Sequence, residues 1–232
     1  MATDFLQRSK LLLGEENIEK FQASKVIVFG LGGVGGGVVE ALARSGIGKI
    51  TLVDYDKIDV TNLNRQLIAT VDNIGLYKVD EWEKRILSIN PSCQIEKFND
   101  RLSFENIEKF SLADYDYVID AIDDIKGKVA LIKYCKDRNI NIIASMGAGK
   151  RLDPTKIKIS DIYKTSVCPL ARKMRKELRD LSIKNLKVVY SDEKPIDGNF
   201  EQMPSISFVP ITCGMAISSE VIRDLIELKK VK

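Results

Sequence analysis

Glycines repeat in the segment Gly30-Leu31-Gly32-Gly33-Val34-Gly35, which matches the G-x-G-x-x-G pattern. The segment follows an apolar run, residues 24–30, and opens a helix predicted over residues 35–45. Glycines permit a tight turn and let backbone N–H groups at a helix N-terminus approach a phosphate. Asp54 ends the next apolar run, about twenty residues on, where a carboxylate can bind both ribose hydroxyls. Gly30, Gly32, Gly33, Gly35 and Asp54 therefore predict an adenine nucleotide site, which fits NAD as well as ATP.

Amide and basic side chains follow the predicted ribose-binding acid, and they distinguish an ATP site from an NAD site. They are Asn62, Asn64, Arg65, Gln66 and Lys78, and the carboxylate of Asp56 precedes them. Hydride transfer has no use for such a cluster, whereas nucleotidyl transfer needs cations where charge develops on the α-phosphoryl group and the departing pyrophosphate. Arginine can hold phosphate oxygens through a bidentate fork, and lysine acts as a point charge. The cluster favours ATP.

A group of aspartates, Asp120, Asp123 and Asp124, lies at the end of another apolar run, residues 115–122. Open α/β sheets bind ligands at the carboxyl ends of their strands. A carboxylate at that position can hold the Mg²⁺ ion that accompanies ATP. The sequence therefore predicts ATP and Mg²⁺ as the cofactors.

Histidine is absent from the 232 residues, which excludes Ser-His-Asp hydrolysis, histidine-ligated metals and histidine proton relays. A reaction that depends mainly on charge stabilisation loses nothing by this absence. The cysteines Cys93, Cys135, Cys168 and Cys213 are dispersed and form no CxxC pair, which fits a reducing cytoplasm. No apolar stretch reaches the length of a membrane span, and the N-terminus does not resemble an export signal. We expect a cytoplasmic protein that does not bind membranes.

Positive charge is concentrated between residues 164 and 187. This segment has a net charge of +6, whereas the whole chain has +3. Such a local basic surface suggests a polyanionic partner, although a solvated helix rich in lysine and arginine is an equally good interpretation of the charge alone.

Strand-like and helix-like segments alternate along the chain, which predicts an α/β fold: a Rossmann-like, mainly parallel sheet with helices on both faces and an elaborated C-terminal third. We expect one domain, 1–232, with a nucleotide-binding core at 1–149 and a basic substrate-binding segment, strands and a helix at 150–232. The expected strands are residues 24–30, 49–56, 94–98, 115–122, 140–145, 187–191 and 206–211. The expected helices are residues 5–21, 35–45, 76–89, 104–110, 129–137 and 216–228, and residues 192–204 are expected to form a polar loop.

These motifs resemble, in order and spacing, the adenylating enzymes related to ubiquitin-activating E1 proteins, whose bacterial members form the ThiF/MoeB/HesA group. The resemblance covers residues 8–149 and rests on GLGGVG, SGIG, LVDYD, TNLNRQ, IGLYK and DAIDD. It implies a homodimer in which Arg8 reaches into the neighbouring subunit's site. It also implies that Asn62, Asn64, Arg65 and Lys78 grip the triphosphate, and that Asp123 holds Mg²⁺ and is essential for adenylation.

One branch of the family is similar beyond residue 143 as well. The sequence ASMGAGKRLDPTKIKISDIYKTSVCPLARKMRKELR and the later KVVYS resemble the branch that modifies tRNA, and the zinc-binding CxxC pairs of many protein-activating members are missing. The resemblance implies adenylation of the threonylcarbamoyl carboxylate on adenosine 37 of tRNA, followed by ring closure with loss of AMP. It also implies tRNA contacts by Lys164, Arg172, Lys173, Arg175 and Lys176.

Two other functions stay open. The chain could activate a small ubiquitin-like sulfur carrier, with Cys168 forming a thioester, since some relatives use a cysteine beyond the magnesium-binding acid. It could also be a non-enzymatic module that senses NAD, although binding alone would not require Arg65, Lys78 and Asp123. Cys213 is expected to pack in an apolar strand. An accessory sulfur-transfer protein stays open as a further partner.

Overall fold

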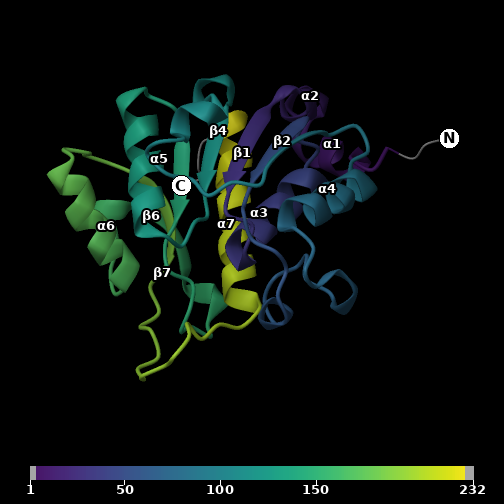
Figure 1. Cartoon of the computed structure of the whole chain (residues 1–232). Coiled ribbons are helices and arrows are strands. Elements are labelled where there is room, and N and C mark those ends of the chain that lie inside the picture. Colours follow the sequence, from purple (N-terminus) through teal and green to yellow (C-terminus); the bar gives the residue numbers. More distant parts are fainter. Residues whose placement is uncertain (1–3, 228–232) are drawn as a thin grey trace.

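A single seven-stranded sheet forms the centre of the computed structural model, which describes residues 4–227 (Figure 1). The strand order is β3-β2-β1-β4-β5-β7-β6, and every neighbouring pair is parallel except β6 and β7. The strands are β1 (Lys25–Phe29), β2 (Lys49–Val53), β3 (Gln94–Phe98), β4 (Tyr117–Asp120), β5 (Ile142–Ser145), β6 (Ile157–Asp161) and β7 (Lys187–Ser191). The predicted mainly parallel α/β fold is confirmed.

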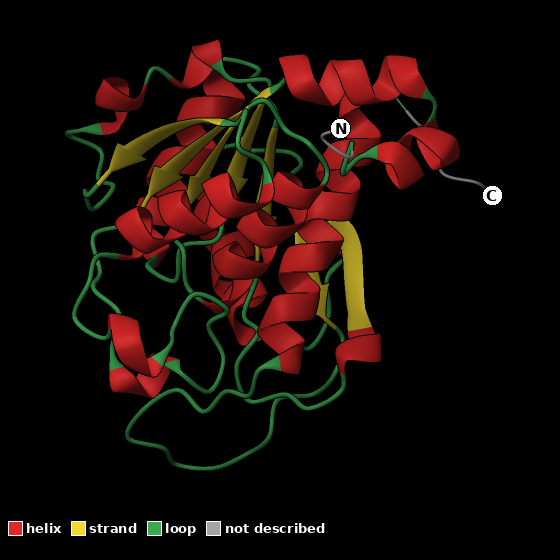
Figure 2. Cartoon of the chain, turned by 90° about the vertical axis from the view of Figure 1, so that its right-hand side faces the viewer, coloured by secondary structure: helices red, strands yellow, loops and turns green. Residues whose placement is uncertain are grey.

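Helices cover both faces of the sheet (Figure 2). One face carries α2, α3, α4 and α7, and the other carries α5 and α6. The helices are α1 (Gln7–Leu13), α2 (Glu15–Ala23), α3 (Gly33–Arg44), α4 (Lys78–Ile89), α5 (Ile125–Asp137), α6 (Pro169–Asp180) and α7 (Phe208–Leu225). Among residues 4–227, no helix combines the length and the hydropathy needed to cross a bilayer.

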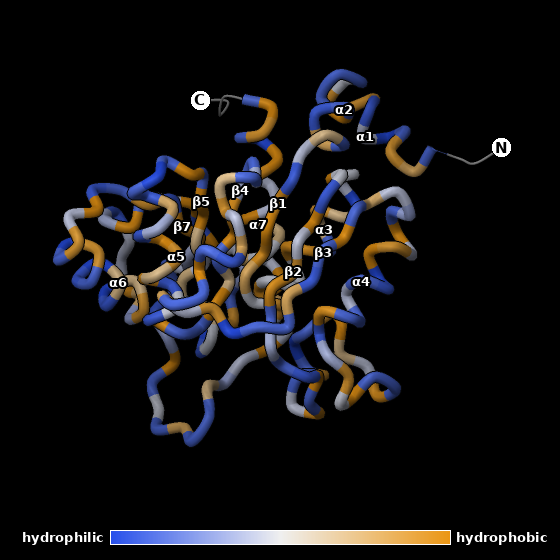
Figure 3. The backbone as a smooth tube through the Cα atoms, turned by 45° about the horizontal axis from the view of Figure 1, so that its top comes forward, coloured by the Kyte–Doolittle hydropathy of each residue, from blue (hydrophilic) through white to orange (hydrophobic). Residues whose placement is uncertain are grey.

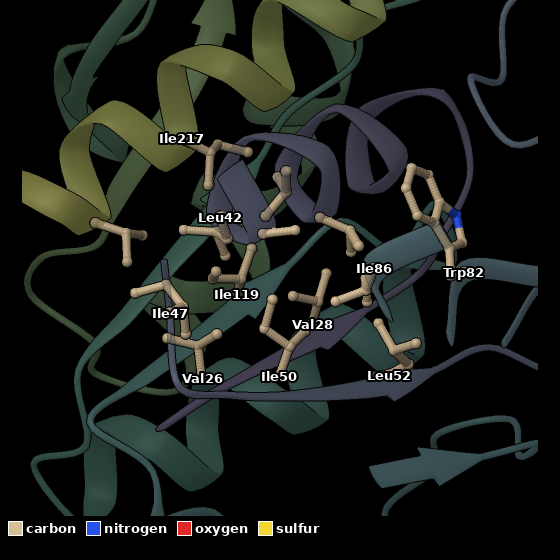
Figure 4. Close-up of a cluster of buried hydrophobic side chains, with 14 of the residues drawn as sticks. Val26, Val28, Leu42, Ile47, Ile50, Leu52, Trp82, Ile86, Ile119 and Ile217 are labelled. Carbon is tan, nitrogen blue, oxygen red and sulfur yellow. The ribbon is translucent and has the colours of Figure 1, made fainter. Parts of the chain in front are cut away.

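Alternate residues of the buried strands supply the two layers of the core. On β1, Val26 and Val28 pack under α3 and α7, whereas Ile27 and Phe29 face α5 and α6. Figure 4 shows the first of these layers, with Trp82 of α4 closing its edge. In Figure 3 hydrophobic residues run along the central strands, whereas the loops beyond the strand ends mix hydrophilic and hydrophobic residues. The rigid sheet thereby fixes the loops at its carboxyl edge.

Helices α3 and α7 cross closely because glycine faces the partner backbone on each. A Cβ atom on Gly37 would lie 2.8 Å from the carbonyl oxygen of Ile211, and one on Gly214 would lie 2.3 Å from that of Val34. The close approach also brings Pro210, in the first turn of α7, against Gly33 at the start of α3. The C-terminal helix therefore supports the glycine-rich turn directly.

Several details of the predicted elements were wrong. The helix expected over residues 104–110 is only a 3-10 turn, Ile107–Phe110. Residues 206–211 were expected to form a strand, but α7 begins at Phe208, so Cys213 lies in a helix. A short apolar run does not distinguish a strand from a buried helix, and Pro210 is tolerated in a first helical turn. Strand β6 was not predicted, because it is only partly buried at the sheet edge. Gly14, with φ +85°, divides the first predicted helix into α1 and α2. Residue 228, the predicted end of the closing helix, lies outside the described residues.

Candidate active site

A pocket of about 540 Å³ opens at the carboxyl ends of β1, β2 and β4. Ten of the residues predicted from the sequence line it: Gly30, Gly32, Gly33, Asp54, Asp56, Asn62, Arg65, Gln66, Lys78 and Asp123. The chain contributes them from three separate loops, since parallel strands end at a common edge. Gly35, Asn64 and Arg8 do not line this pocket.

The glycine-rich turn leaves no room for side chains where the chain folds back on itself. Gly30 has φ +84°, and a Cβ atom there would lie 2.7 Å from the carbonyl oxygen of Ala121. A Cβ atom on Gly35 would lie 1.8 Å from the carbonyl oxygen of Gly30. Gly32 is the N-cap of α3, and a Cβ atom on it would have only the Gln66 amide nitrogen within 4 Å. The first N–H groups of α3 have no intrahelical partner, so the turn offers an anion a cradle of donors.

Asp54 holds the turn and the pocket rim together. One carboxylate oxygen accepts a 2.6 Å hydrogen bond from the Leu31 N–H, and the other accepts a 2.8 Å bond from the Asp56 N–H. Burial raises the pKa of Asp54, and the nearby Lys78 charge opposes that rise. The carboxylate therefore organises the turn that precedes α3 as well as lining the pocket.

Lys78, the first residue of α4, brings a positive charge to the pocket. Its ammonium lies 2.8 Å from an Asp56 carboxylate oxygen and 4.0 Å from one of Asp54. Its side chain is only 5% exposed. A buried cation between two carboxylates is held in a defined place, so its charge can act on a bound anion without first ordering the side chain.

The segment between β2 and α4 is folded by its own polar side chains. The side chains of Asp59 and Asn62 form reciprocal caps of a 3-10 turn, Val60–Asn62. The Arg65 guanidinium donates to the Thr61 carbonyl at 2.5 Å and to the Asn64 side-chain oxygen at 3.1 Å. Most of the conformation of this segment is therefore set before any ligand arrives.

Two amides in this segment differ in their surroundings. The Asn64 amide donates to the Ser205 carbonyl at 3.0 Å, so it joins two loops instead of lining the pocket. The Gln66 side chain is buried in the pocket wall, and its oxygen has no hydrogen-bond partner among residues 4–227. A buried polar atom without a partner is costly, which points to a ligand on this wall.

Asp123 presents an exposed carboxylate to the pocket from the loop after β4. The next residue, Asp124, caps α5 by accepting a 2.8 Å hydrogen bond from the Gly127 N–H. In the part of the chain that the structure describes, no cluster of three or more His, Cys, Asp or Glu residues could enclose a metal ion. Mg²⁺ needs no such cluster, since it commonly takes one or two carboxylates together with phosphate oxygens and water. Asp123 therefore fits a magnesium ion that arrives with a phosphate ligand.

A buried ion pair below this loop was missed from the sequence. The Lys128 ammonium of α5 lies 2.9 Å from an Asp120 carboxylate oxygen, and both side chains are fully buried. The same oxygen accepts a 3.1 Å hydrogen bond from the Ile122 N–H. Burial raises the pKa of Asp120, and Lys128 opposes that rise. The pair fixes the turn that leads to Asp123.

Further lining residues were also missed. Asp100, Arg101 and Leu102 follow β3, and the rule that ligands bind at carboxyl ends of strands would have found them. Met203, Ser205 and Pro210 come from the C-terminal third, and no local signal in the sequence places them at the pocket.

The predicted tRNA-contacting residues lie on or beside α6, outside this pocket. Arg172, Lys173 and Lys176 form an exposed basic face, opposite the buried Ala171, Met174 and Leu178. Lys164 is exposed at the end of a 3-10 turn. Arg175 differs, because it is partly buried and its guanidinium donates to the carbonyl and hydroxyl oxygens of Thr165. The guanidinium of Arg175 is therefore already engaged in holding Thr165 against α6.

Arg8 and the two cysteines of interest lie away from the pocket lining. Arg8 is exposed on α1, at the end of the sheet opposite the pocket loops (Figure 1). Cys168 is 2% exposed at the N-cap of α6. Cys213 is buried in α7, where burial raises its pKa to about 12. Neither thiol is presented to a ligand in the pocket.

Comparison with known proteins gives consistent results. The chain is 43% identical to the tRNA threonylcarbamoyladenosine dehydratase of Bacillus subtilis, over 97% of both proteins. It is 44% identical to the Haemophilus influenzae protein of the same name, over 88% of this chain and 77% of that protein. Crystal structures of the Escherichia coli tRNA N6-threonylcarbamoyladenosine dehydratase, TcdA, in complex with AMP and with ATP superpose with a TM-score of 0.90. Each is 36% identical and covers 95% of this chain and 93% of its own.

The family model described as "ThiF family" matches residues 6–232. This match includes the glycine-rich turn, the pocket loops and the C-terminal helix that supports them. The chain therefore belongs to the ThiF family.

Proposed function

We propose that the chain uses ATP to adenylate the carboxylate of threonylcarbamoyladenosine at position 37 of tRNA and then closes the ring, with net loss of water. The observation that carries this proposal is a single pocket that combines the glycine-rich turn, the buried Lys78 and the exposed Asp123. The named function of the similar proteins, and the AMP and ATP in the E. coli structures, support it.

The pocket residues would divide the work of binding ATP. The N-terminus of α3 would receive phosphate oxygens, and Asp54 would bind the ribose while it holds the Leu31 N–H. Arg65 and Lys78 would stabilise the negative charge that develops as pyrophosphate leaves. Gln66, whose buried oxygen has no partner within residues 4–227, would complete the wall.

Asp123 would hold Mg²⁺ against the phosphates. Bound there, the ion would neutralise charge on the triphosphate. Asp120 and Lys128 would act indirectly, by keeping the turn before Asp123 in one conformation.

The reaction needs no enzymic nucleophile. A carboxylate oxygen of the substrate attacks the α-phosphorus, and pyrophosphate leaves. A nitrogen or oxygen of the substrate then attacks the activated acyl carbon, and AMP leaves with one former carboxylate oxygen. The absence of histidine and the burial of both Cys168 and Cys213 agree with this chemistry.

We also propose a homodimer in which Arg8 completes the neighbouring subunit's site. Arg8 lies too far from its own pocket to line it, and the neighbouring Leu11 and Leu12 are 84% and 82% exposed on the same short helix. Exposed leucines of this kind suit a protein interface.

We further propose that the chain is a single cytoplasmic adenylation domain, in which residues 1–149 bind the nucleotide and residues 150–232 bind the substrate. Its four cysteines are free thiols, as expected in a reducing compartment.

The exposed face of α6 would contact the phosphate backbone of tRNA. Replacing both Arg172 and Lys173 with Glu should weaken tRNA binding and reduce its salt dependence, while ATP binding stays unchanged. The charge-matched control replaces Lys20 and Lys84, which are exposed on α2 and α4, with Glu. Equal tRNA affinities for the two double variants would refute this role for α6.

The proposal as a whole is tested by incubating the purified protein with ATP, Mg²⁺ and tRNA that carries the linear modification. Mass analysis of the nucleosides should show loss of one water at the modified adenosine. AMP release only in the presence of a carrier protein ending in Gly-Gly would instead establish a sulfur-carrier activator.

A further inference from the structure

The long loop between β7 and α7, residues 192–207, crosses the end of the sheet where the pocket opens, and we call it the strap (Figure 1). Backbone hydrogen bonds tie it to Lys150, whose N–H donates to the Pro204 carbonyl at 2.9 Å and whose carbonyl accepts from the Ile196 N–H at 2.8 Å. The Asn64 amide holds Ser205 from the other side. The strap therefore has a defined position although it contains no helix or strand.

The strap forms part of the pocket mouth. Met203 and Ser205 line the pocket together with Gly149. The Met203 side chain packs where a Cβ atom on Gly149 would lie, 2.8 Å from its Cγ atom. Even so, Met203 is 71% exposed. An apolar side chain that is anchored at one end and open to solvent is suited to contact a ligand at the mouth.

Phe200 lies on the same loop, and its ring is also held in place. The Lys150 ammonium lies 4.6 Å from the ring centroid and donates a hydrogen bond to the Gly198 carbonyl at 3.3 Å. The ring packs so closely on Gly198 that a Cβ atom there would lie 2.6 Å from it. Yet Phe200 is 44% exposed. Phe200 is therefore an exposed ring on the strap, held against Lys150, the residue that follows the pocket-lining Gly149.

The charge of the strap limits what can bind there. It contains four acidic residues (Asp192, Glu193, Asp197 and Glu201) and one lysine, a net charge of −3. Asp192 is paired with Lys158 and Asp197 with Lys194, so the strap has no surplus of positive charge for a phosphate backbone. The exposed side chains of Phe200 and Met203 instead suit a flat, uncharged ligand. Nucleobases of unpaired RNA stack on aromatic side chains in this way.

We propose that Phe200 and Met203 receive the adenine ring of the substrate nucleotide after it leaves the anticodon-loop stack. This inference rests on the proposed function. The carboxylate that is activated belongs to the threonylcarbamoyl group attached to that ring. The ring must therefore lie at the pocket mouth while the carboxylate reaches into the pocket. The basic face of α6 would hold the backbone, and the acidic strap would admit the base alone.

The experiment compares the Michaelis constants of Phe200→Ala, Phe200→Trp and Ile196→Ala for modified tRNA. Ile196 is the control, because it is 45% exposed on the same strap, as Phe200 is at 44%, but has no aromatic ring on which a base could stack. Phe200→Ala should raise the constant roughly 5- to 150-fold, the range for loss of one stacked base. Phe200→Trp should restore it, and Ile196→Ala should behave as wild type. ATP affinity should be the same in all three variants.

Three results would overturn the proposal. One is an unchanged Michaelis constant for Phe200→Ala, measured while the wild-type protein cyclises the substrate. That result would refute this inference and leave the proposed function intact. Another is a change of oligomeric state of Phe200→Ala in size-exclusion chromatography, because the patch would then be a contact between copies of the chain. If the wild-type protein does not cyclise the modification, the proposed function and this inference both fail.

Discussion

Replacing Gly30 with Ala tests the geometry of the pocket with a matched control at Gly75. Both glycines have a positive φ, +84° and +87°, so alanine at either position must adopt a left-handed conformation that costs about 1–2 kcal/mol. At Gly75 a Cβ atom has no neighbour within 4 Å, so conformational strain is the whole effect. At Gly30 it would lie 2.7 Å from the Ala121 oxygen and 2.9 Å from the Ala121 carbon. Such overpacking adds about 1–3 kcal/mol.

The two variants should differ in function as well as in stability. The Gly30 variant can relieve its contact only by moving the backbone at Ala121, two residues before Asp123. We therefore expect urea unfolding to show a loss of about 1–2 kcal/mol for Gly75→Ala and about 2–5 kcal/mol for Gly30→Ala. Calorimetric titration with a non-hydrolysable ATP analogue should show wild-type affinity for Gly75→Ala and at least about tenfold weaker binding for Gly30→Ala. Equal stabilities and equal affinities in the two variants would refute this account of the turn.

Three further changes test the roles of single residues. Asp123→Asn should abolish turnover. The unfolding free energy should stay unchanged, because the Asp123 carboxylate has no ion pair within residues 4–227. Retained turnover in this variant would exclude Asp123 from the mechanism. Cys168→Ala should keep wild-type turnover, and complete loss with an intact fold would support a thioester. Lys128→Met should destabilise the fold by about 3–5 kcal/mol by leaving the Asp120 charge buried and unpaired. Burial raises the pKa of Asp120, so the loss of unfolding free energy caused by Lys128→Met should become smaller as acid protonates Asp120 and larger as the pH rises. A loss of unfolding free energy that does not depend on pH would contradict this.

Much of the fold was predictable because its strands are short, apolar and bounded by glycine or polar residues. The expected bounds of β3 and β7 agree with the structure. Strand β6 was missed because an edge strand is only partly buried, so its apolar pattern is weak. The start of α7 was placed too late, since the β-branched and aromatic residues before Cys213 suit a strand as well as a buried helix.

The candidate site was predictable where it follows from motifs along the chain. The glycine-rich turn, Asp54, Lys78 and Asp123 meet in one pocket, as their places after parallel strands require. The contribution of the strap was not predictable, because Met203 reaches the pocket only through tertiary contacts. Arg175 was grouped with the exposed cations by its charge, whereas the fold uses it to hold Thr165. Local patterns therefore identify the nucleotide chemistry better than the substrate contacts.

The most direct test of carboxylate adenylation follows the oxygen atoms. Modified tRNA with ¹⁸O in the threonylcarbamoyl carboxylate is incubated with the protein, ATP and Mg²⁺, and the released nucleotide is analysed by mass spectrometry. Attack of the carboxylate on the α-phosphorus predicts AMP that carries one ¹⁸O atom, together with unlabelled pyrophosphate. Unlabelled AMP, or ADP with labelled phosphate, would contradict the account.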